Sequence, residues 1–107
     1  MDYEQPRISL AVLRFVADHP ATFGRHRTAR ILVGRINEDD LDRAPTLPVE
    51  PLLAGETQAR IVRAIDELVA AGIVAKSFGD RPRLALTRCG WRFLAALELD
   101  AAIGGSS

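Results

Sequence analysis

The chain has 107 residues, of which 48% are hydrophobic and 26% are charged, and its formal net charge is zero. This length fits one domain with one core, because a single core serves about 50 to 200 residues. No run of about 18 apolar residues is present, which excludes a membrane-spanning helix. The zero total charge argues against a pure polyanion binder, although the distribution of the charges matters more than their sum.

The chain contains one cysteine, Cys89. A single cysteine excludes an internal disulfide and indicates a reducing, cytoplasmic compartment. We expect its thiol to be buried at the start of a helix. Residues 1–7 carry Asp2 and Glu4 and lack the basic-then-apolar order of a signal peptide.

Two helices are predicted in the first third of the chain. The first spans residues 6–19, where apolar residues recur at helical spacing between Pro6 and Pro20. The second runs from about Arg25 to Arg35. Its expected inward residues are Ala29, Ile31, Leu32 and Val33.

Residues 37–55 contain three prolines and are predicted to form a loop, with room for a short helical turn. Four apolar residues of this loop are expected to pack on the core and hold the loop against it: Leu47, Val49, Leu52 and Leu53. The acidic residues Asp39, Asp40 and Asp42 are interpreted as solvated surface rather than as metal ligands.

The last half of the chain predicts a helix, a hairpin and a further helix. The first of these helices spans residues 56–71, with Ile61, Ile65 and Leu68 on one face, and Gly72 ends it. Strands are predicted at 73–78 and 82–87 around a turn at 79–81. The last helix spans 88–102, with Trp91, Leu94, Ala95 and Leu97 as its apolar residues, before a flexible tail at 104–107. The predicted fold class is mostly α with a small β-hairpin, a winged helix-turn-helix formed by one domain over residues 1–103.

The chain lacks the motifs of common enzymes. It has no G-x-x-x-x-G-K-[ST] nucleotide-binding loop, and His19, His26 and Cys89 lack zinc-ligand spacing. We therefore expect no catalytic residue, no metal and no cofactor.

The basic residues are concentrated in blocks. Residues 24–35 contain four arginines and a histidine without one acid, and a helix start of this kind binds anions well. The predicted DNA-binding residues of this block are Arg25, His26, Arg27, Thr28 and Arg30. The alternative is that these arginines pair with the acidic segment that follows.

The start of the helix at 56–71 and the hairpin supply further candidates. In winged helices the third helix usually faces DNA. The predicted DNA-binding residues of this helix are therefore Thr57, Gln58, Arg60 and Arg63. The alternative for Arg60 and Arg63 is pairing with acids of their own helix. In the hairpin, Lys76 and Arg81 are predicted to contact DNA, with Arg83 beside them. Phe78 either stacks on a terminal base pair or folds back onto the core, and the short turn favours the second alternative.

Three motifs together resemble a known family. The run 22–34, TFGRHRTARILVG, resembles the F-G…L-x-G helix of the RQC domain of RecQ-family DNA helicases, and residues 61–72 and 84–90 (LALTRCG) resemble that domain's ending. The resemblance covers most of residues 8–97. It implies a winged-helix domain that contacts phosphates through residues 24–28 and 57–60. The four-cysteine zinc module that usually precedes this domain and the motor domain are absent from the sequence.

The expected function is therefore a non-catalytic, RQC-like DNA-binding module. We expect it to bind double-stranded or forked DNA as a monomer, in the cytoplasm at the nucleoid. It would serve a RecQ-type helicase motor, either as a fragment of that helicase, as its partner protein or as a stand-alone derivative. The alternatives are a winged-helix transcription regulator, dimerising through its last helix, and a protein-interaction module.

Overall fold

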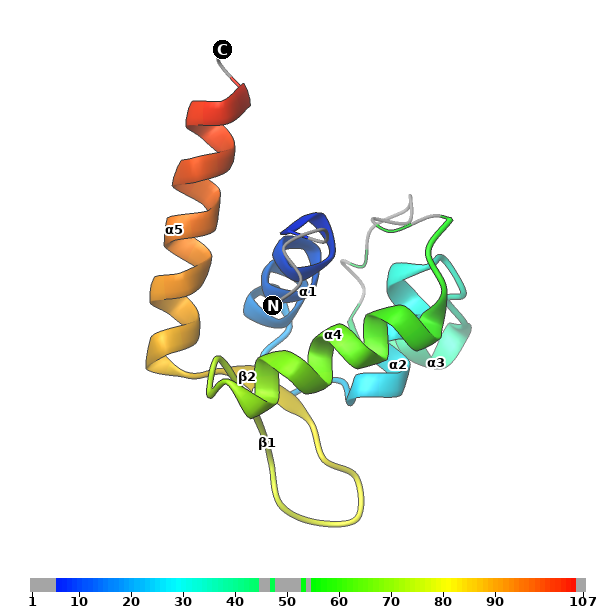
Figure 1. Cartoon of the computed structure of the whole chain (residues 1–107). Coiled ribbons are helices and arrows are strands. Elements are labelled where there is room, and N and C mark those ends of the chain that lie inside the picture. Colours follow the sequence, from blue (N-terminus) through cyan, green and yellow to red (C-terminus); the bar gives the residue numbers. More distant parts are fainter. Residues whose placement is uncertain (1–5, 45–46, 48–52, 54, 106–107) are drawn as a thin grey trace.

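Four helices, a two-stranded hairpin and a long final helix follow one another in the computed structural model, which describes residues 6–44, 47, 53 and 55–105 (Figure 1). Their bounds are α1 Pro6–Asp18, α2 Arg25–Leu32, α3 Glu38–Arg43, α4 Gln58–Ala70, β1 Val74–Lys76, β2 Leu84–Leu86 and α5 Arg88–Gly105. The fold is thus mostly helical with one small antiparallel hairpin, arranged as in a winged helix, as predicted.

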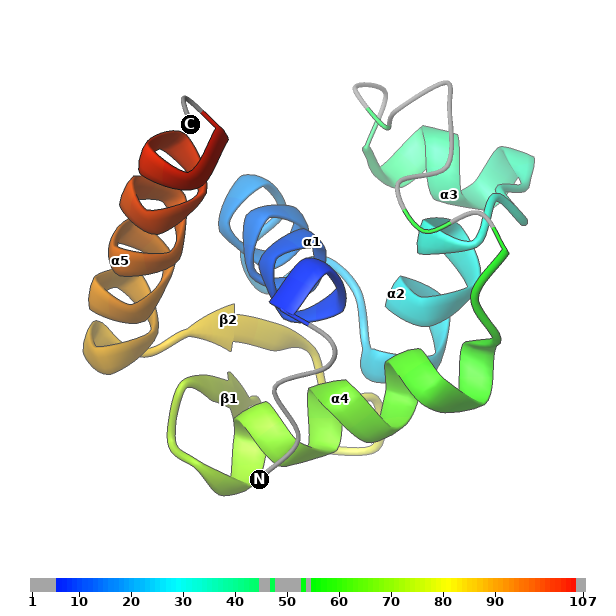
Figure 2. The same cartoon turned by 45° about the horizontal axis from the view of Figure 1, so that its top comes forward.

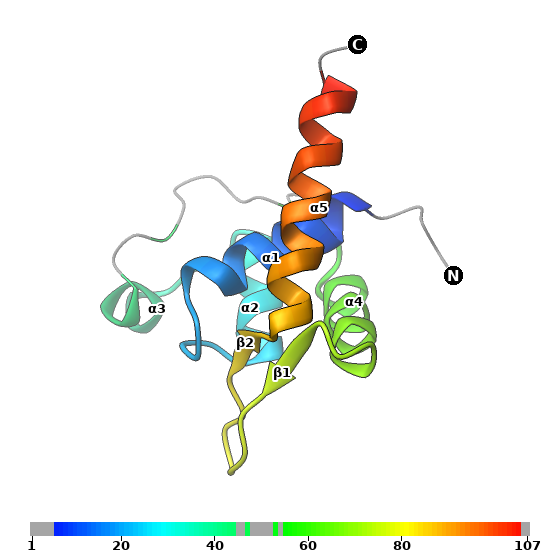
Figure 3. The same cartoon turned by 90° about the vertical axis from the view of Figure 1, so that its left-hand side faces the viewer.

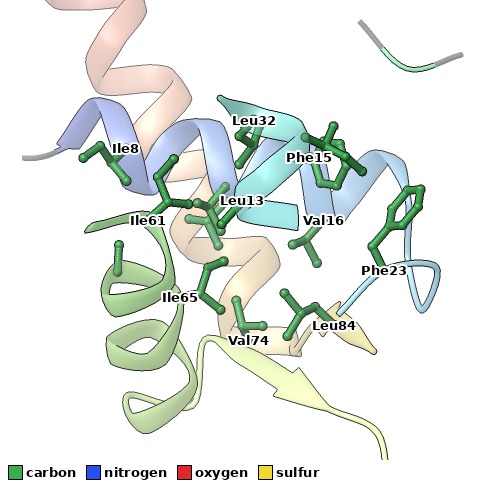
Figure 4. Packing of buried hydrophobic residues seen from close by; sticks show 14 of the residues in the cluster. Ile8, Leu13, Phe15, Val16, Phe23, Leu32, Ile61, Ile65, Val74 and Leu84 are labelled. Atoms are coloured by element: carbon green, nitrogen blue, oxygen red, sulfur yellow. The ribbon is translucent and has the colours of Figure 1, made fainter. Parts of the chain in front are cut away.

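Helix α1 occupies the centre and lies between α2 and α5 (Figure 2). Its buried residues recur at helical spacing, and Val12 and Leu13 have no exposed surface. They meet apolar residues from every other large element, as Figure 4 shows for Ile61 and Ile65 of α4 and for Leu84 of β2. Burying each such side chain stabilises the fold by about 1.5–3 kcal/mol. The apolar stripes predicted for α1 and α4 are confirmed.

The hairpin is shorter than predicted. Val74 pairs with Leu86 and Lys76 pairs with Leu84. The side chains of Val74 and Leu84 are buried and form the hairpin's part of the core. Beyond Lys76 one more backbone hydrogen bond joins the two arms of the hairpin, from the Ser77 N–H to the Arg83 carbonyl oxygen at 2.9 Å. Residues 78–82 then form a projecting loop, because they include Gly79 at a positive φ of 114° and Pro82, which has no N–H.

The segment predicted as a loop contains the helix α3. A reciprocal pair of hydrogen bonds begins it: the Asp40 N–H donates to the Asn37 side chain at 2.9 Å, and the Asn37 N–H donates to the Asp40 carboxylate at 3.0 Å. Leu47 and Leu53 are buried, as predicted, and the Leu53 N–H donates to the Leu32 carbonyl oxygen at 2.9 Å. Val49 and Leu52 lie outside the described residues.

Helix α5 begins at a side-chain cap and extends further than predicted. The Thr87 hydroxyl accepts a hydrogen bond from the Gly90 N–H at 3.0 Å and donates to the Gly72 carbonyl oxygen at 2.6 Å. The helix includes Gly104 and Gly105, which were predicted to belong to a flexible tail; residues 106–107 lie outside the described part. The expected burial of Cys89 is wrong, because its side chain, in the first turn of α5, is exposed.

Candidate nucleic-acid interface

A pocket of about 420 Å³ lies between the start of α2 and the hairpin. Seven of its lining residues carry a cationic or imidazole side chain, and none of the lining residues is acidic. The lining residues are Thr22, Phe23, Gly24, Arg25, His26, Arg27, Arg43, Lys76, Arg81, Pro82 and Arg83. The chain has no net charge, yet six of its fourteen lysine and arginine residues converge here.

Backbone hydrogen bonds hold the two walls of this pocket together. The Leu84 N–H donates to the Phe23 carbonyl oxygen at 2.9 Å, and the Ala21 N–H donates to the Leu84 carbonyl oxygen at 2.9 Å. The Phe23 ring is buried against Phe15, with ring centroids 5.7 Å apart. The segment before α2 therefore runs beside β2 in a fixed position, with the hairpin loop projecting from the body (Figure 3).

Gly24 allows the closest approach between the two walls. A Cβ atom at this position would lie 2.8 Å from the Pro82 carbonyl oxygen, which is closer than real Cβ atoms approach backbone. A side chain here would push the hairpin away from α2. The glycine of the F-G pair thus sets the width of the pocket.

The start of α2 contributes open backbone donors to the pocket. Gly24 is the N-cap residue and supplies no side-chain hydrogen bond, and the first helical bond runs from the Thr28 N–H to the Gly24 carbonyl oxygen at 2.9 Å. The N–H groups of residues 25–27 precede this bond and have no acceptor inside the helix. Amides at a helix start carry partial positive charge, which adds to the charge of the side chains around them.

The arginines on the helix side of the pocket are held by carboxylates that do not line it. Arg25 donates to both carboxylate oxygens of Asp66 at 2.8 Å. Arg27 lies 3.1 Å and Arg43 lies 3.3 Å from the carboxylate of Asp39. All of these side chains are between 35% and 57% exposed, and such exposed pairs contribute about 0–1 kcal/mol. Arg25 and Arg43 can therefore exchange a carboxylate for a phosphate at low cost.

The cations on the hairpin side have no such partners. Lys76 and Arg81 are exposed, and neither forms an ion pair with any residue of the described ranges. Arg83 is exposed and donates at 3.5 Å to the Ala21 carbonyl oxygen. The wing thus carries three cations, Lys76, Arg81 and Arg83, against one exposed acid, Asp80.

Five of the predicted DNA-binding residues line this one pocket: Arg25, His26, Arg27, Lys76 and Arg81. Two others of the same block do not. Thr28 is 1% exposed, so its side chain belongs to the core and is inaccessible to a ligand. Arg30 donates to both carboxylate oxygens of Asp40, at 2.9 and 3.0 Å, and to the Arg35 carbonyl oxygen at 2.7 Å. Arg30 therefore has a structural role.

The interpretation of the acidic run as solvated surface is wrong for Asp40. Its side chain is fully buried, and it accepts hydrogen bonds from Arg30 and from the Asn37 N–H. Arg27 approaches it to 3.6 Å. The alternative considered for the basic block, pairing with the following acidic segment, thus holds for Arg27 and Arg30. A buried carboxylate requires such partners, because an unpaired charge in the core is costly.

The residues predicted at the start of α4 form a separate surface. Thr57 caps the helix by accepting from the Arg60 N–H at 3.2 Å, and the Gln58 side chain accepts from Arg35 at 2.9 Å. Arg35 follows the end of α2, whereas Arg25 at its start contacts Asp66. The start of α4 therefore lies at the opposite end of α2 from the pocket.

The two arginines of that surface differ in their contacts. Arg60 lies 3.1 Å from Glu56, as the alternative interpretation stated. Arg63 is exposed and forms no ion pair within the described part of the chain. Neither residue lines the pocket.

Phe78 is exposed at the tip of the hairpin. The expectation that it folds back onto the core is wrong, because its side chain is 103% exposed. The core ends at Val74 and Leu84, and the loop beyond Lys76 leaves the body before Phe78 is reached.

Two cationic pocket residues were not among the predicted contacts. Arg83 lies beside Arg81 on the wing and could have been included on charge alone. Arg43 carried no such signal, because it follows an acidic run and enters the pocket only through the placement of α3.

Other kinds of site find no support among the described residues. They include no group of three or more histidine, cysteine and acidic side chains placed to hold a metal ion. No helix in the described part of the chain has the length and hydropathy needed to cross a membrane. Comparison of the chain with known protein families, with curated proteins and with solved structures found no significant match.

Proposed function

We propose that this chain is a non-catalytic winged-helix module that binds double-stranded or forked DNA through the basic pocket between α2 and the hairpin. The observation that carries the proposal is the convergence of Arg25, Arg27, Arg43, Lys76, Arg81 and Arg83 on one hollow without an acidic lining residue. Arginine side chains bind phosphate oxygens in pairs, and a row of them follows a nucleic-acid backbone.

The shape of the pocket supports a phosphate ligand. The walls meet at Gly24 and are joined by backbone hydrogen bonds, so the backbone that carries the cations is held in place before a ligand arrives. A prearranged site loses less conformational entropy on binding than a flexible one. The open amides at the start of α2 offer further donors to the same phosphate.

The resemblance to the RQC domain supplies the biological setting of the proposal. The F-G pair of that motif falls on Phe23 and Gly24, which build the wall of the pocket. On this proposal the chain acts for a RecQ-type helicase in the cytoplasm, at the nucleoid, and contacts the duplex beside a fork.

Fluorescence anisotropy tests this function. Labelled blunt duplex, forked duplex and single strand are titrated with the chain at two salt concentrations. We expect binding to duplex or fork that weakens as salt rises, because bound phosphates release counterions. An absence of binding at low salt would overturn the proposal and favour a protein-interaction module.

Paired variants locate the contact. Lys76→Ala with Arg81→Ala removes two pocket cations that have no ion pair with another described residue, so the fold should be unaffected. The magnitude of the slope of log affinity against log salt should fall by about 2. Arg63→Ala is the control for each of the two single substitutions, because Arg63 is also exposed and lies outside the pocket. An equal loss in the control would place the contact elsewhere.

A further inference from the structure

One residue that lines the basic pocket, His26, has a side chain whose charge changes near neutral pH. The other charged residues of the described lining are arginines and one lysine, and these side chains stay protonated throughout that range. An imidazole changes its charge between about pH 5 and pH 8. In this range, therefore, the charge of the lining changes through His26.

The imidazole of His26 is accessible to a ligand in the pocket. His26 is exposed and is the second residue of α2, which begins after the N-cap Gly24. Its ring forms no hydrogen bond or ion pair with any residue in the described ranges. Both ring nitrogens are therefore open to a ligand, and in the imidazolium form both of them donate.

No carboxylate lines the pocket beside His26. The charged residues that line it together with His26 come from α2, from the end of α3 and from the hairpin, and they are Arg25, Arg27, Arg43, Lys76, Arg81 and Arg83. Asp39 and Asp66 contact arginines of the pocket without lining it, and Asp80 is exposed in the hairpin loop. Arg30, one turn further along α2, is held by a buried carboxylate. A bound phosphate thus brings an anion to a lining that contains none.

We propose that a backbone phosphate bound in the pocket favours protonation of His26, so that DNA binding takes up a proton and tightens as pH falls. This inference rests on the proposed function and adds a regulation of the same site. An opposite charge within about 4–6 Å favours the charged form of an ionisable group. Phosphate oxygens also accept the hydrogen bonds that imidazolium donates.

The sign of the effect follows from linkage. A ligand that favours protonation of His26 binds more tightly once His26 is protonated, because the coupling between the two equilibria is reciprocal. The affinity for DNA is therefore highest below the pH range in which imidazole titrates. It falls as pH rises through that range.

His19, the other histidine of the chain, supplies the control. Its ring packs against the rings of Phe15 and Phe23, with centroid distances of 4.8 and 6.1 Å, and it does not line the pocket. Protonation of His19 changes the net charge of the chain by the same amount as protonation of His26. A response that belongs to His26 alone therefore reports on the pocket rather than on the total charge.

Fluorescence anisotropy with forked DNA measures the effect at constant ionic strength, between about pH 8 and about pH 5.5. We expect the affinity of the wild type to rise about five- to tenfold as pH falls across this range. The rise should be absent in His26→Gln, whose side chain does not titrate, and present in His19→Gln. His26→Arg carries a permanent charge, so at the upper end of the range it should bind more tightly than His26→Gln. Circular dichroism confirms the fold of each variant at each pH.

Isothermal titration calorimetry counts the protons directly. Titrations at one pH, in buffers that differ in their enthalpy of ionisation, give the number of protons taken up when DNA binds. At about pH 6.5, within the imidazole range, we expect a fraction of a proton per pocket for the wild type and for His19→Gln. His26→Gln should take up none.

The outcomes separate this inference from the proposed function. Binding that weakens with salt but does not change with pH would overturn the inference and leave the proposed function standing. A rise in affinity that persists in His26→Gln would also overturn it, because another group would then take up the proton. An absence of DNA binding at every pH would overturn the proposed function, and the inference with it.

Discussion

The guanidinium group of Arg25, at the start of α2, donates to both carboxylate oxygens of Asp66 in α4 at 2.8 Å. This pair joins residues 41 positions apart in the sequence. It also places a carboxylate directly behind a pocket that otherwise contains only basic and neutral residues. A phosphate that binds Arg25 has to compete with Asp66.

Asp66→Asn should therefore strengthen DNA binding. The change removes a negative charge beside the pocket and frees the Arg25 guanidinium, and we expect the dissociation constant at low salt to fall about three- to tenfold. Stability should change by less than about 1 kcal/mol, since both side chains are well exposed. Anisotropy titration measures the affinity, and Glu67→Gln, a neighbouring exposed acid, is the control. Weaker binding by Asp66→Asn would show that the pair orients Arg25 for binding rather than competing for it.

Asp40→Ala should destabilise the fold by about 2–4 kcal/mol. The buried carboxylate holds Arg30 and accepts from the Asn37 N–H at the start of α3, so its loss leaves a partly buried guanidinium and one backbone N–H without this partner. Urea unfolding measures the change. Asp42→Ala, an exposed acid of the same helix, should change the free energy of unfolding by less than about 0.5 kcal/mol. A loss below about 1 kcal/mol for Asp40→Ala would mean that the site collapses around a substitute partner.

Gly24→Ala should weaken DNA binding by altering the geometry of the pocket. Its Cβ would press on the Pro82 carbonyl group and separate the hairpin from α2. Gly90→Ala is a control outside the pocket, because its Cβ would overlap the Ile73 carbonyl oxygen, more closely than a Cβ at Gly24 would approach Pro82. Gly24→Ala should lose about 1–3 kcal/mol of stability and Gly90→Ala should lose more, which thermal unfolding measures. Below their melting temperatures, reduced affinity is expected for Gly24→Ala alone; equal affinities would remove Gly24 from the site.

Phe78→Ala should leave the melting temperature unchanged. The ring is 103% exposed, so it buries no apolar surface that could stabilise the fold. On the proposed function, the tip of the wing meets the exposed base pair at a fork. We therefore expect affinity for forked DNA to fall about tenfold, while affinity for a blunt duplex lacking unpaired arms falls less. Anisotropy with both substrates gives the ratio. An unchanged ratio would show that the wing tip does not contact the fork.

The order of the elements and most of the core could be read from the sequence. Ile61, Ile65 and Leu68 recur with helical spacing, and Gly72 ends their helix at a φ of 76° that suits glycine. Such features depend on neighbours a few residues apart, and a linear pattern contains them. The sequence left open whether its two basic segments act together, and it is the structure that places Arg25, Arg27, Lys76 and Arg81 around one pocket.

The pairing of charges was decided by the tertiary structure. Arg30 and Arg27 occur in the same basic block, yet one is committed to the buried Asp40 while the other lines the pocket. Arg43 follows an acidic run and still joins the cations. Periodicity shows which side of a helix is apolar, but it contains no information on which carboxylate approaches which guanidinium across the fold.

The exposure of Phe78 and Trp91 was decided in the same way. An apolar residue in a sequence indicates a tendency to be buried, and burial requires a surface to pack against. The core ends at Leu84 on the hairpin and at Leu94 and Leu97 on α5, so both rings lie beyond it. The sequence by itself determined the local elements and their apolar faces, because these depend on short-range spacing. The tertiary structure decided which charged and aromatic side chains remain available to a partner, because that depends on long-range packing.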